Sequence, residues 1–183
     1  PGVLHALVMW GFLVFGWVSL EHLAVGFAGL EGASGDDSWY GGFAALWSAL
    51  VLIGIVGLAV RRFVFQPRAL GKVSAGSGIV AALIVALMAT YLLGWRGFEP
   101  GSALWRINWR LHTLSLFAML WVIPSSKHLH LFLGPFNVFF RGSDLTSATR
   151  ALREDDDDDL GLATFADLSK KDILDLNSCV ECG

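Results

Sequence analysis

Two histidines, His112 and His130, stand near the two ends of an apolar stretch of this sequence. They are eighteen residues apart, about five turns of α-helix, so on one continuous helix both imidazoles would point the same way. The rise between them would be about 27 Å, close to the hydrocarbon thickness of a bilayer. Imidazole is costly to bury in lipid without a partner, and haem iron is a suitable partner. The spacing therefore predicts a helix that offers one haem ligand near each face of a membrane.

Two further histidines, His5 and His22, lie near the ends of the first apolar segment. We expect this segment to run antiparallel to the one holding His112, so that His5 pairs with His130 and His22 pairs with His112. The seventeen residues between His5 and His22 turn the direction by about 100° from the starting face, so pairing of both requires the helix to bend. His128 is the substitute for His130 at the inner position.

The composition of the chain is that of a membrane protein. Of the 183 residues, 55% are hydrophobic and only 16% are charged, and the mean hydropathy is +0.59. A soluble domain would carry about a quarter charged residues. The net charge is −3, and most acidic residues gather near the C-terminal end. A chain with this charge offers no basis for binding nucleic acid.

Four apolar segments are long enough to cross a bilayer, and they predict an all-α membrane protein with a bundle of four transmembrane helices. They cover residues 3–30, 43–60, 79–95 and 111–133. The loop after the second segment is rich in arginine and lysine, whereas the loop before it is acidic. By the positive-inside rule the basic loop is cytoplasmic. We therefore expect a multi-pass protein of the cell (plasma) membrane whose C-terminal region is cytoplasmic.

Charged residues near the predicted outer face have two interpretations each. Arg96, Arg106 and Arg110 lie beside tryptophans between the third and fourth segments. They are candidates either for an aromatic belt at the membrane interface or for contacts with haem propionates. Glu21, next to His22, is a candidate proton carrier for quinone chemistry or a side chain that reaches the aqueous interface.

The C-terminal part is polar and ends in the only two cysteines, Cys179 and Cys182. The run Asp155–Asp159 favours a solvated acidic linker over a calcium site, because the glycine and spacing of an EF-hand loop are absent. Ser169 is expected to N-cap a short helix through Leu176. The cysteine pair is too closely spaced for a structural disulfide and predicts an iron–sulfur centre, a zinc knuckle or a thiol redox pair.

The segment containing Arg110-Leu111-His112, Ile123-Pro124-Ser125-Ser126-Lys127 and His130 resembles the last haem-binding helix of the membrane-anchor gamma subunit of respiratory nitrate reductase. The resemblance implies that His112 binds an outer haem and His130 an inner one, with His5 as the inner partner. The second histidine of that earlier helix in the family falls at Phe15 here, and His22 is the nearest substitute. The family has five spans, and a helix before Pro1 would supply the fifth.

The tail from Ser169 to Gly183 resembles the opening of a ferredoxin-type motif, C-x-x-C-G-x-C. Fusion of a haem anchor to such a domain resembles heterodisulfide reductase-like and glycolate-oxidase-like iron–sulfur oxidoreductases. Some of these pass electrons between electron-transfer flavoprotein and quinone. The resemblance implies two b-type haems, a [4Fe–4S] cluster held by Cys179 and Cys182, and menaquinone or ubiquinone as substrate.

The expected organisation is a transmembrane dihaem cytochrome b-like domain over 1–140, an acidic cytoplasmic linker over 141–168 and the start of an iron–sulfur domain over 169–183. The expected function is respiratory electron transfer between cytoplasmic iron–sulfur clusters and quinone through the haems. Expected partners are membrane lipid, quinone, and electron-transfer flavoprotein or another dehydrogenase subunit. Two alternatives stay open: an anchor subunit whose catalytic partner is a separate soluble protein, and a transporter or structural membrane protein whose histidines only bridge helices.

Overall fold

The computed structural model describes residues 2–29, 38–67, 73–140 and 168–178 of the chain. Every regular element in these ranges is a helix, which confirms the predicted all-α class there. The chain divides into two compact units, Pro1–Val122 and Ile123–Gly183. The aspartate run, nearly all of the predicted linker and the two cysteines lie outside the described residues, as does the side chain of His22.

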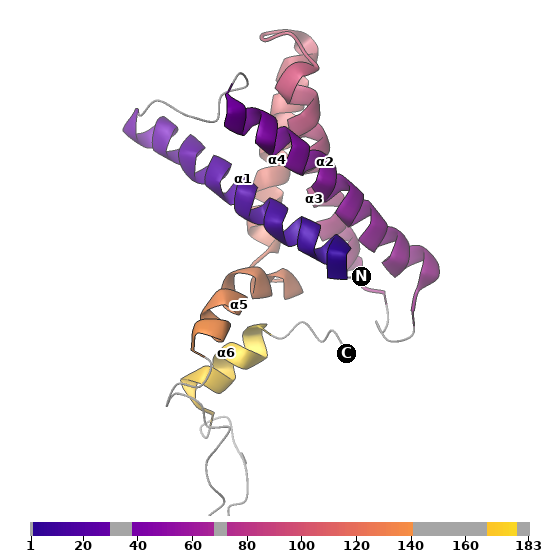
Figure 1. Ribbon diagram of the computed structural model, residues 1–183, viewed down its shortest axis with the longest axis vertical. Coiled ribbons are helices and arrows are strands. Elements are labelled where there is room, and N and C mark those ends of the chain that lie inside the picture. Colours follow the sequence, from indigo (N-terminus) through magenta and orange to yellow (C-terminus); the bar gives the residue numbers. More distant parts are fainter. Residues whose placement is uncertain (1, 30–37, 68–72, 141–167, 179–183) are drawn as a thin grey trace, which may run out of the picture. The chain divides into compact units, whose positions relative to one another are not determined.

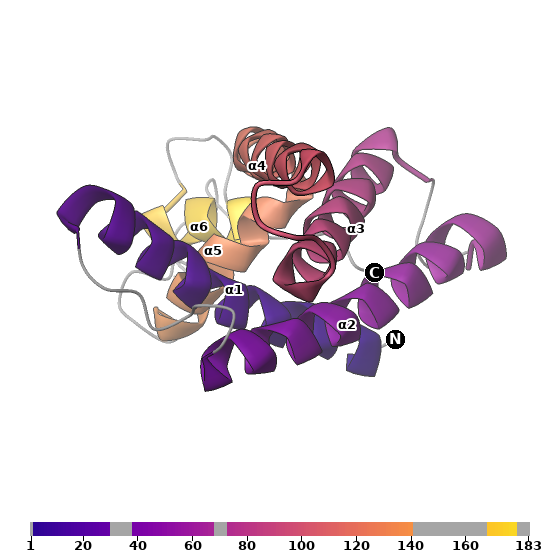
Figure 2. The same cartoon turned by 90° about the horizontal axis from the view of Figure 1, so that it is seen from above.

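Four long helices form the first unit, and each packs against the next one in chain order. Figures 1 and 2 show α1 and α2 as neighbouring helices, and α3 and α4 as a second neighbouring pair. The elements are α1 (Gly2–Ala28), α2 (Trp39–Ala59) with its π-helical continuation η1 (Val60–Phe65), α3 (Ala75–Arg96) and α4 (Ala103–Val122).

Short polar residues define where these apolar helices begin and end. The side-chain oxygen of Ser38 accepts a hydrogen bond from the backbone N–H of Gly41 at 2.9 Å, and so caps α2. Ser74 caps α3 in the same way through the N–H of Ser77 at 3.3 Å. Gln66, which has a left-handed backbone with φ of 43°, ends the π-helical turn after α2.

Glycines allow α1 and α2 to approach closely. A Cβ atom added at Gly54 would lie 3.0 Å from the backbone oxygen of Leu4, and one added at Gly57 would lie 2.9 Å from the Leu4 side chain. A Cβ at Gly11 would overlap the side chain of Val51. Small residues at helix contacts are typical of membrane helices, where packing has to replace the hydrophobic effect between helices.

Three stretches of helix are long and apolar enough to cross a membrane: Gly2–Glu21, Trp39–Phe65 and Ala75–Arg96. Many of their large apolar side chains are exposed in the isolated chain, Trp10 and Ile53 among them. Such broad apolar exposure is expected of a lipid-facing surface. The prediction of a membrane protein is therefore supported, with three of the four predicted spans. α4 is less apolar because its first half contains two arginines and an asparagine, so a fourth span and a fifth before Pro1 stay predictions.

The prediction of one continuous helix over residues 111–133 is wrong. α4 ends at Val122, a turn follows, and the chain re-enters helical structure through the short η3 (Lys127–Leu129) before α5 (His130–Phe139). Pro124 lacks a backbone N–H, and its ring opposes continuation of a helix, so the helix stops beside it. Ser126 then caps η3 by accepting a hydrogen bond from the N–H of His128 at 3.3 Å. The five-turn relation between His112 and His130 therefore does not hold, since they lie on different helices.

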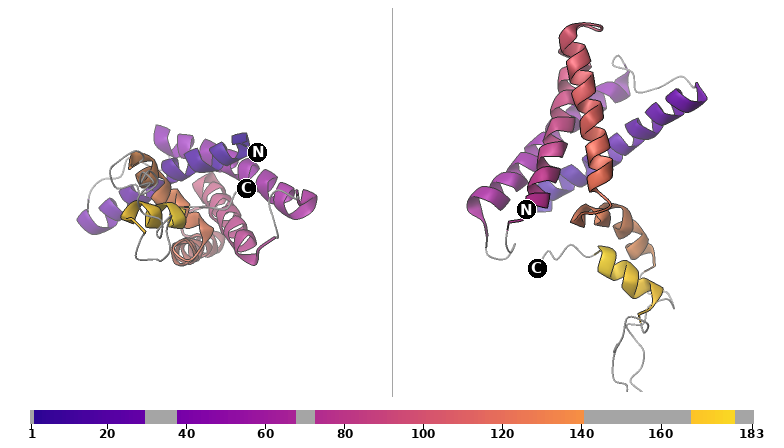
Figure 3. Two further views of the ribbon diagram at one scale, coloured as in Figure 1. Left: turned by 90° about the horizontal axis from the view of Figure 1, so that it is seen from below. Right: turned by 180° about the vertical axis from the view of Figure 1, so that it is seen from behind.

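The second unit contains α5 and α6 (Lys170–Ser178), which contact each other (Figures 1 and 3). The predicted N-cap at Ser169 is confirmed. The Ser169 hydroxyl accepts a hydrogen bond from the N–H of Asp172 at 3.2 Å, and the Asp172 carboxylate accepts one from the N–H of Ser169 at 2.8 Å. This reciprocal pair starts α6 immediately before the segment that leads to the cysteines.

The close contact at Gly54 gives a stability prediction. Gly54→Ala should lower the free energy of unfolding in detergent by about 1 kcal/mol, because the added methyl group meets the rigid backbone of α1. Gly16→Ala is the matched control, since a Cβ there meets no atom within 4 Å. Thermal unfolding of the two variants measures the difference. Equal stability of both variants would contradict the α1–α2 contact.

Candidate functional site

In the first unit, a set of hydrogen-bonded polar residues joins α3 to α4. The ring nitrogen Nδ1 of His112 lies 2.8 Å from the hydroxyl oxygen of Thr90. The same hydroxyl lies 2.6 Å from the backbone oxygen of Ala86 and 3.1 Å from that of Leu87, on its own helix. His112 is thus held by a hydrogen bond between neighbouring helices, halfway along α4.

Asn108, one helical turn before His112, reinforces this contact. Its side chain is buried, and its Nδ2 donates to the backbone oxygen of Thr90 at 2.9 Å. Gly94 leaves the necessary room, because a Cβ there would lie 3.0 Å from the Asn108 Nδ2. On the opposite side of α3, the hydroxyl of Ser48 on α2 donates to the backbone oxygen of Met88 at 2.9 Å. These bonds fix both α2 and α4 against the middle of α3.

α1 reaches the same level of α3 through an aromatic contact. The rings of Phe15 and Tyr91 pack edge to face, with centroids 5.0 Å apart. Tyr91 follows Thr90 directly in the chain. Phe15, the position at which the resemblance predicted a second histidine, therefore packs as a phenyl ring against α3. His22 follows Phe15 by seven residues, which is about 10 Å along the helix.

The described contacts do not test the two predicted pairs of histidines, because the His22 side chain lies outside the described residues and His130 belongs to the second unit. His5 is exposed in the first turn of α1, and His130 begins α5 in the other unit. The rings of His128 and His130 lie near each other, with centroids 6.2 Å apart. Within the described residues, no group of three or more histidine, cysteine, aspartate or glutamate side chains is arranged to hold a metal ion. The proposed pairing of the histidines is therefore neither assembled nor refuted by these contacts.

Glu21 lies seven residues before the end of α1 and is partly buried. Its carboxylate interacts electrostatically with Tyr40 at the start of α2. The Tyr40 hydroxyl donates to the backbone oxygen of Val14 at 3.0 Å, which ties the beginning of α2 to α1.

The arginines near the same end of the unit are exposed. The guanidinium of Arg96 lies over the ring of Trp95, 5.0 Å from its centroid, which is the cation–π contact expected in an aromatic belt. Arg106 and Arg110 lie on α4 about 120–160° around the helix from His112. They therefore do not share a helix face with His112, and their role as haem propionate contacts stays a prediction.

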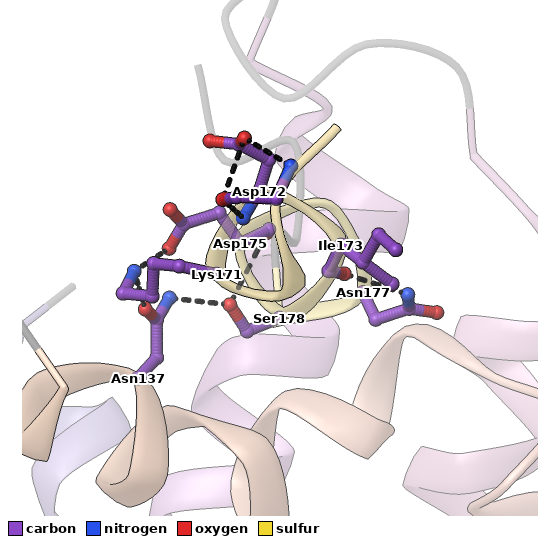
Figure 4. A network of polar contacts seen from close by, with 8 residues as sticks. Asn137, Lys171, Asp172, Ile173, Asp175, Asn177 and Ser178 are labelled. Atoms are coloured by element: carbon purple, nitrogen blue, oxygen red, sulfur yellow. Dashed lines mark hydrogen bonds and ion pairs between the residues drawn. The ribbon is translucent and has the colours of Figure 1, made fainter. Parts of the chain in front are cut away.

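In the second unit, a polar cluster clamps α6 onto α5 (Figure 4). The ammonium of Lys171, only 6% exposed, donates to the side-chain oxygen of Asn137 and forms an ion pair with Asp175. The Nδ2 of Asn137 donates to the hydroxyl of Ser178 at 2.6 Å. Ser178 is the last residue of α6 and the neighbour of Cys179 in the chain. The clamp therefore fixes the residue from which the cysteine segment departs.

Sequence reasoning did not identify Thr90, Asn108 or Asn137 as site residues. A weak signal exists for the first two, because each is a polar residue in or beside an apolar segment and Asn108 stands four residues before His112 on one helix face. Asn137 gave no such signal, since its partners come from a segment more than thirty residues away.

Comparison with known proteins relates the chain to iron–sulfur oxidoreductases. It is 26% identical to the probable iron-sulfur-binding oxidoreductase FadF of Bacillus subtilis (strain 168) over 100% of the chain and 30% of that protein. It is 25% identical to the EtfAB:quinone oxidoreductase of Syntrophomonas wolfei over 100% of the chain and 31% of that protein. The chain thus spans about a third of the length of these relatives. No family model matches the chain, and no solved structure matches it either.

These similarities support a distant relationship to iron–sulfur oxidoreductases and an oxidoreductase role. A link to quinone is named in one of the two relatives. Neither name mentions haem.

The clamp on α6 gives a prediction about local stability. Lys171→Met should lower the free energy of opening α6 by about 1–3 kcal/mol, because Asn137 and Asp175 lose a charged donor. Amide hydrogen exchange in α6 measures this quantity. Lys170→Met is the control, since Lys170 is exposed on the same helix. If both substitutions left exchange unchanged, the clamp would not hold α6.

Proposed function

We propose that this chain is the membrane-bound part of an iron–sulfur oxidoreductase that carries electrons between a cytoplasmic iron–sulfur centre and quinone. The observation that carries the proposal is the union, in one chain, of three candidate spans with a Cys-x-x-Cys pair directly after α6. The whole chain aligns with a protein named EtfAB:quinone oxidoreductase, which supports quinone and electron-transfer flavoprotein as partners.

Cys179 and Cys182 are proposed as two ligands of a [4Fe–4S] cluster. Their thiolates are close enough in sequence to reach adjacent irons of one cubane, and the further ligands would come from outside these residues. The cluster supplies one-electron transfer when bound. The contribution of the described chain is to fix Ser178, and hence the start of the cysteine segment, on α5 through Asn137.

Haem binding is a more specific part of the proposal. Among the histidines, His112 has the contacts that suit a haem ligand best. Metal-ligating histidines usually have their second ring nitrogen engaged by a neighbouring polar group, which orients the ring. The contact between His112 and Thr90 meets this requirement. His22 and His112 are proposed for an outer b-type haem, and His5 and His130 for an inner one. Menaquinone or ubiquinone would then exchange electrons near the outer haem.

Glu21 is proposed as the proton carrier of the quinone reaction. Reduction of a quinone consumes protons, so the site needs a group that can donate them at the membrane edge. Glu21 lies in the last third of α1, near the predicted outer face, and its charge acts on Tyr40 at the start of α2. By the positive-inside rule, the basic residues Arg61 and Arg62 in η1 favour a cytoplasmic location for the opposite end, and so support a plasma-membrane protein with its C-terminal region inside.

The cluster assignment is tested by replacing one cysteine in the full-length protein. Cys182→Ser should remove one cluster's iron and sulfide and abolish electron transfer from donor to quinone, because a serine oxygen is a poor ligand for this centre. Iron analysis and electron paramagnetic resonance of the reduced protein measure the loss. Asn177→Ala, which changes an exposed side chain of α6, is the control. An unchanged cluster in Cys182→Ser would contradict the assignment.

The haem assignment is tested by replacing His112. His112→Ala should reduce the b-type α-band of dithionite-reduced protein by about half, because one of two haems loses an axial ligand. Leu111→Ala, at an exposed position of the same helix, should leave the band unchanged. Wild-type protein without an α-band would refute the haem part and leave the iron–sulfur part standing.

A further inference from the structure

One face of α5 carries a stripe of exposed phenyl rings. Phe132, Phe136 and Phe139 are 45%, 58% and 79% exposed. Their spacing of four and then three residues places them within an arc of about 60° along one side of the helix. An exposed apolar surface of this kind marks a place that a protein partner or a membrane covers.

The phenyl stripe lies on a different side of α5 from the clamp that holds α6. Asn137, which faces α6 in Figure 4, lies about 100–160° around the helix from the three rings. Packing of α6 therefore leaves the rings uncovered, as their exposed fractions show. α5 is thus amphipathic, because one side holds the polar clamp and another side presents the phenyl rings.

The length of α5 decides how it could meet a membrane. Its 10 residues, His130–Phe139, rise by about 15 Å, which is half of the hydrocarbon thickness of a bilayer. A helix of this length cannot cross the bilayer, but it can lie in the membrane surface with its apolar side between the headgroups and the acyl chains. Phenylalanine suits that depth, and the polar side of α5 would stay in water.

The chain itself keeps α5 close to a bilayer. α3 is a candidate span, and α4 returns alongside it after the connection over residues 97–102 (Figure 3). The end of α4 at Val122 therefore lies toward the bilayer face at which α3 begins. Even a fully extended chain from Val122 to His130 covers less than about 30 Å. Lipid is thus present at a high effective concentration, which a separate protein partner would have to exceed.

The charge and the size of the stripe also favour lipid. From residue 111 to residue 140 the sequence has no aspartate or glutamate, and its single lysine or arginine is Lys127. No carboxylate in this stretch would repel anionic lipids. Three partly exposed rings on each of two copies of the chain would bury well under the ~1,200 Å² of a stable protein interface. A second copy is therefore a poorer fit to the stripe than a membrane.

We propose that the phenyl stripe of α5 is a membrane-binding surface, which lays this helix flat on the bilayer and leaves α6 on the side of the water. Only a first unit that spans the bilayer is required, so this role is independent of haem and of the iron–sulfur cluster. Because Ser178 is clamped to α5, a surface-bound α5 would keep the start of the cysteine segment at a fixed height above the lipid.

A substitution in the full-length protein in lipid nanodiscs gives the first test. Phe136→Ser should speed amide hydrogen exchange in α5 by about ten- to a hundredfold, which is the effect of losing one buried phenyl ring. Val138→Ser is the matched control, because Val138 is 73% exposed on the same helix but lies off the stripe. It should leave exchange close to that of the wild type. Equal exchange in the two variants would contradict the proposal.

A label that keeps the aromatic ring tests the surface without removing it. Trifluoromethyl-phenylalanine takes the place of Phe136 in one sample and of Val138 in the other, again in nanodiscs. Fluorine relaxation is measured with dissolved oxygen, which concentrates in lipid, and with a water-soluble nickel chelate. We expect the ratio of the oxygen effect to the nickel effect to be several times larger at position 136 than at position 138.

The two probes distinguish lipid from the other possible surroundings of the rings. If the nickel chelate reached both positions equally, the stripe would face water and the membrane-binding role would be overturned. Shielding of position 136 from both probes would also overturn it, because protein, either a second copy or the first unit, would then cover the rings.

Discussion

In an apolar helical bundle, a polar side chain has to find its partner on a neighbouring helix or on its own backbone, because lipid offers none. α3 is the helix on which this constraint acts most strongly here. Its backbone oxygens at Met88 and Thr90 accept from Ser48 of α2 and Asn108 of α4, from two different neighbours. Without these hydrogen bonds, apolar helices could rotate against each other at little cost in free energy. These few bonds therefore set the register on which the remaining contacts depend.

The same constraint connects the fold with the proposed chemistry. Once α4 is fixed on α3, the imidazole of His112 has a defined direction and a defined partner in Thr90. In the second unit, hydrogen bonds that include a charged group have the same effect. Buried Lys171 donates to Asn137, and Asn137 donates to Ser178, which precedes the cysteines. In each unit, a hydrogen bond between helices thus orients or anchors a residue that is a proposed ligand or lies next to one. An electron carrier needs such fixed residues, because the distances between its cofactors have to stay constant.

Much of the fold follows from local rules in the sequence. Three apolar segments predict their helices, and Ser169 with Asp172 predicts the start of α6, because hydrophobic length and capping are local properties. The histidine spacing predicts a helix that continues past Pro124, whereas the ring and the missing N–H of that proline end the helix at Val122. The Thr90–His112 contact could not be predicted, since its partners are twenty-two residues apart and their meeting depends on how two helices pack.

We propose that the helical unit of this chain holds redox centres of its own. An anaerobic redox titration of the full-length protein in nanodiscs, followed by optical and electron paramagnetic resonance spectroscopy, tests this directly. We expect two b-type haem transitions in addition to an iron–sulfur signal. An iron–sulfur signal without any haem transition would contradict it, and would leave the helices as a membrane anchor alone.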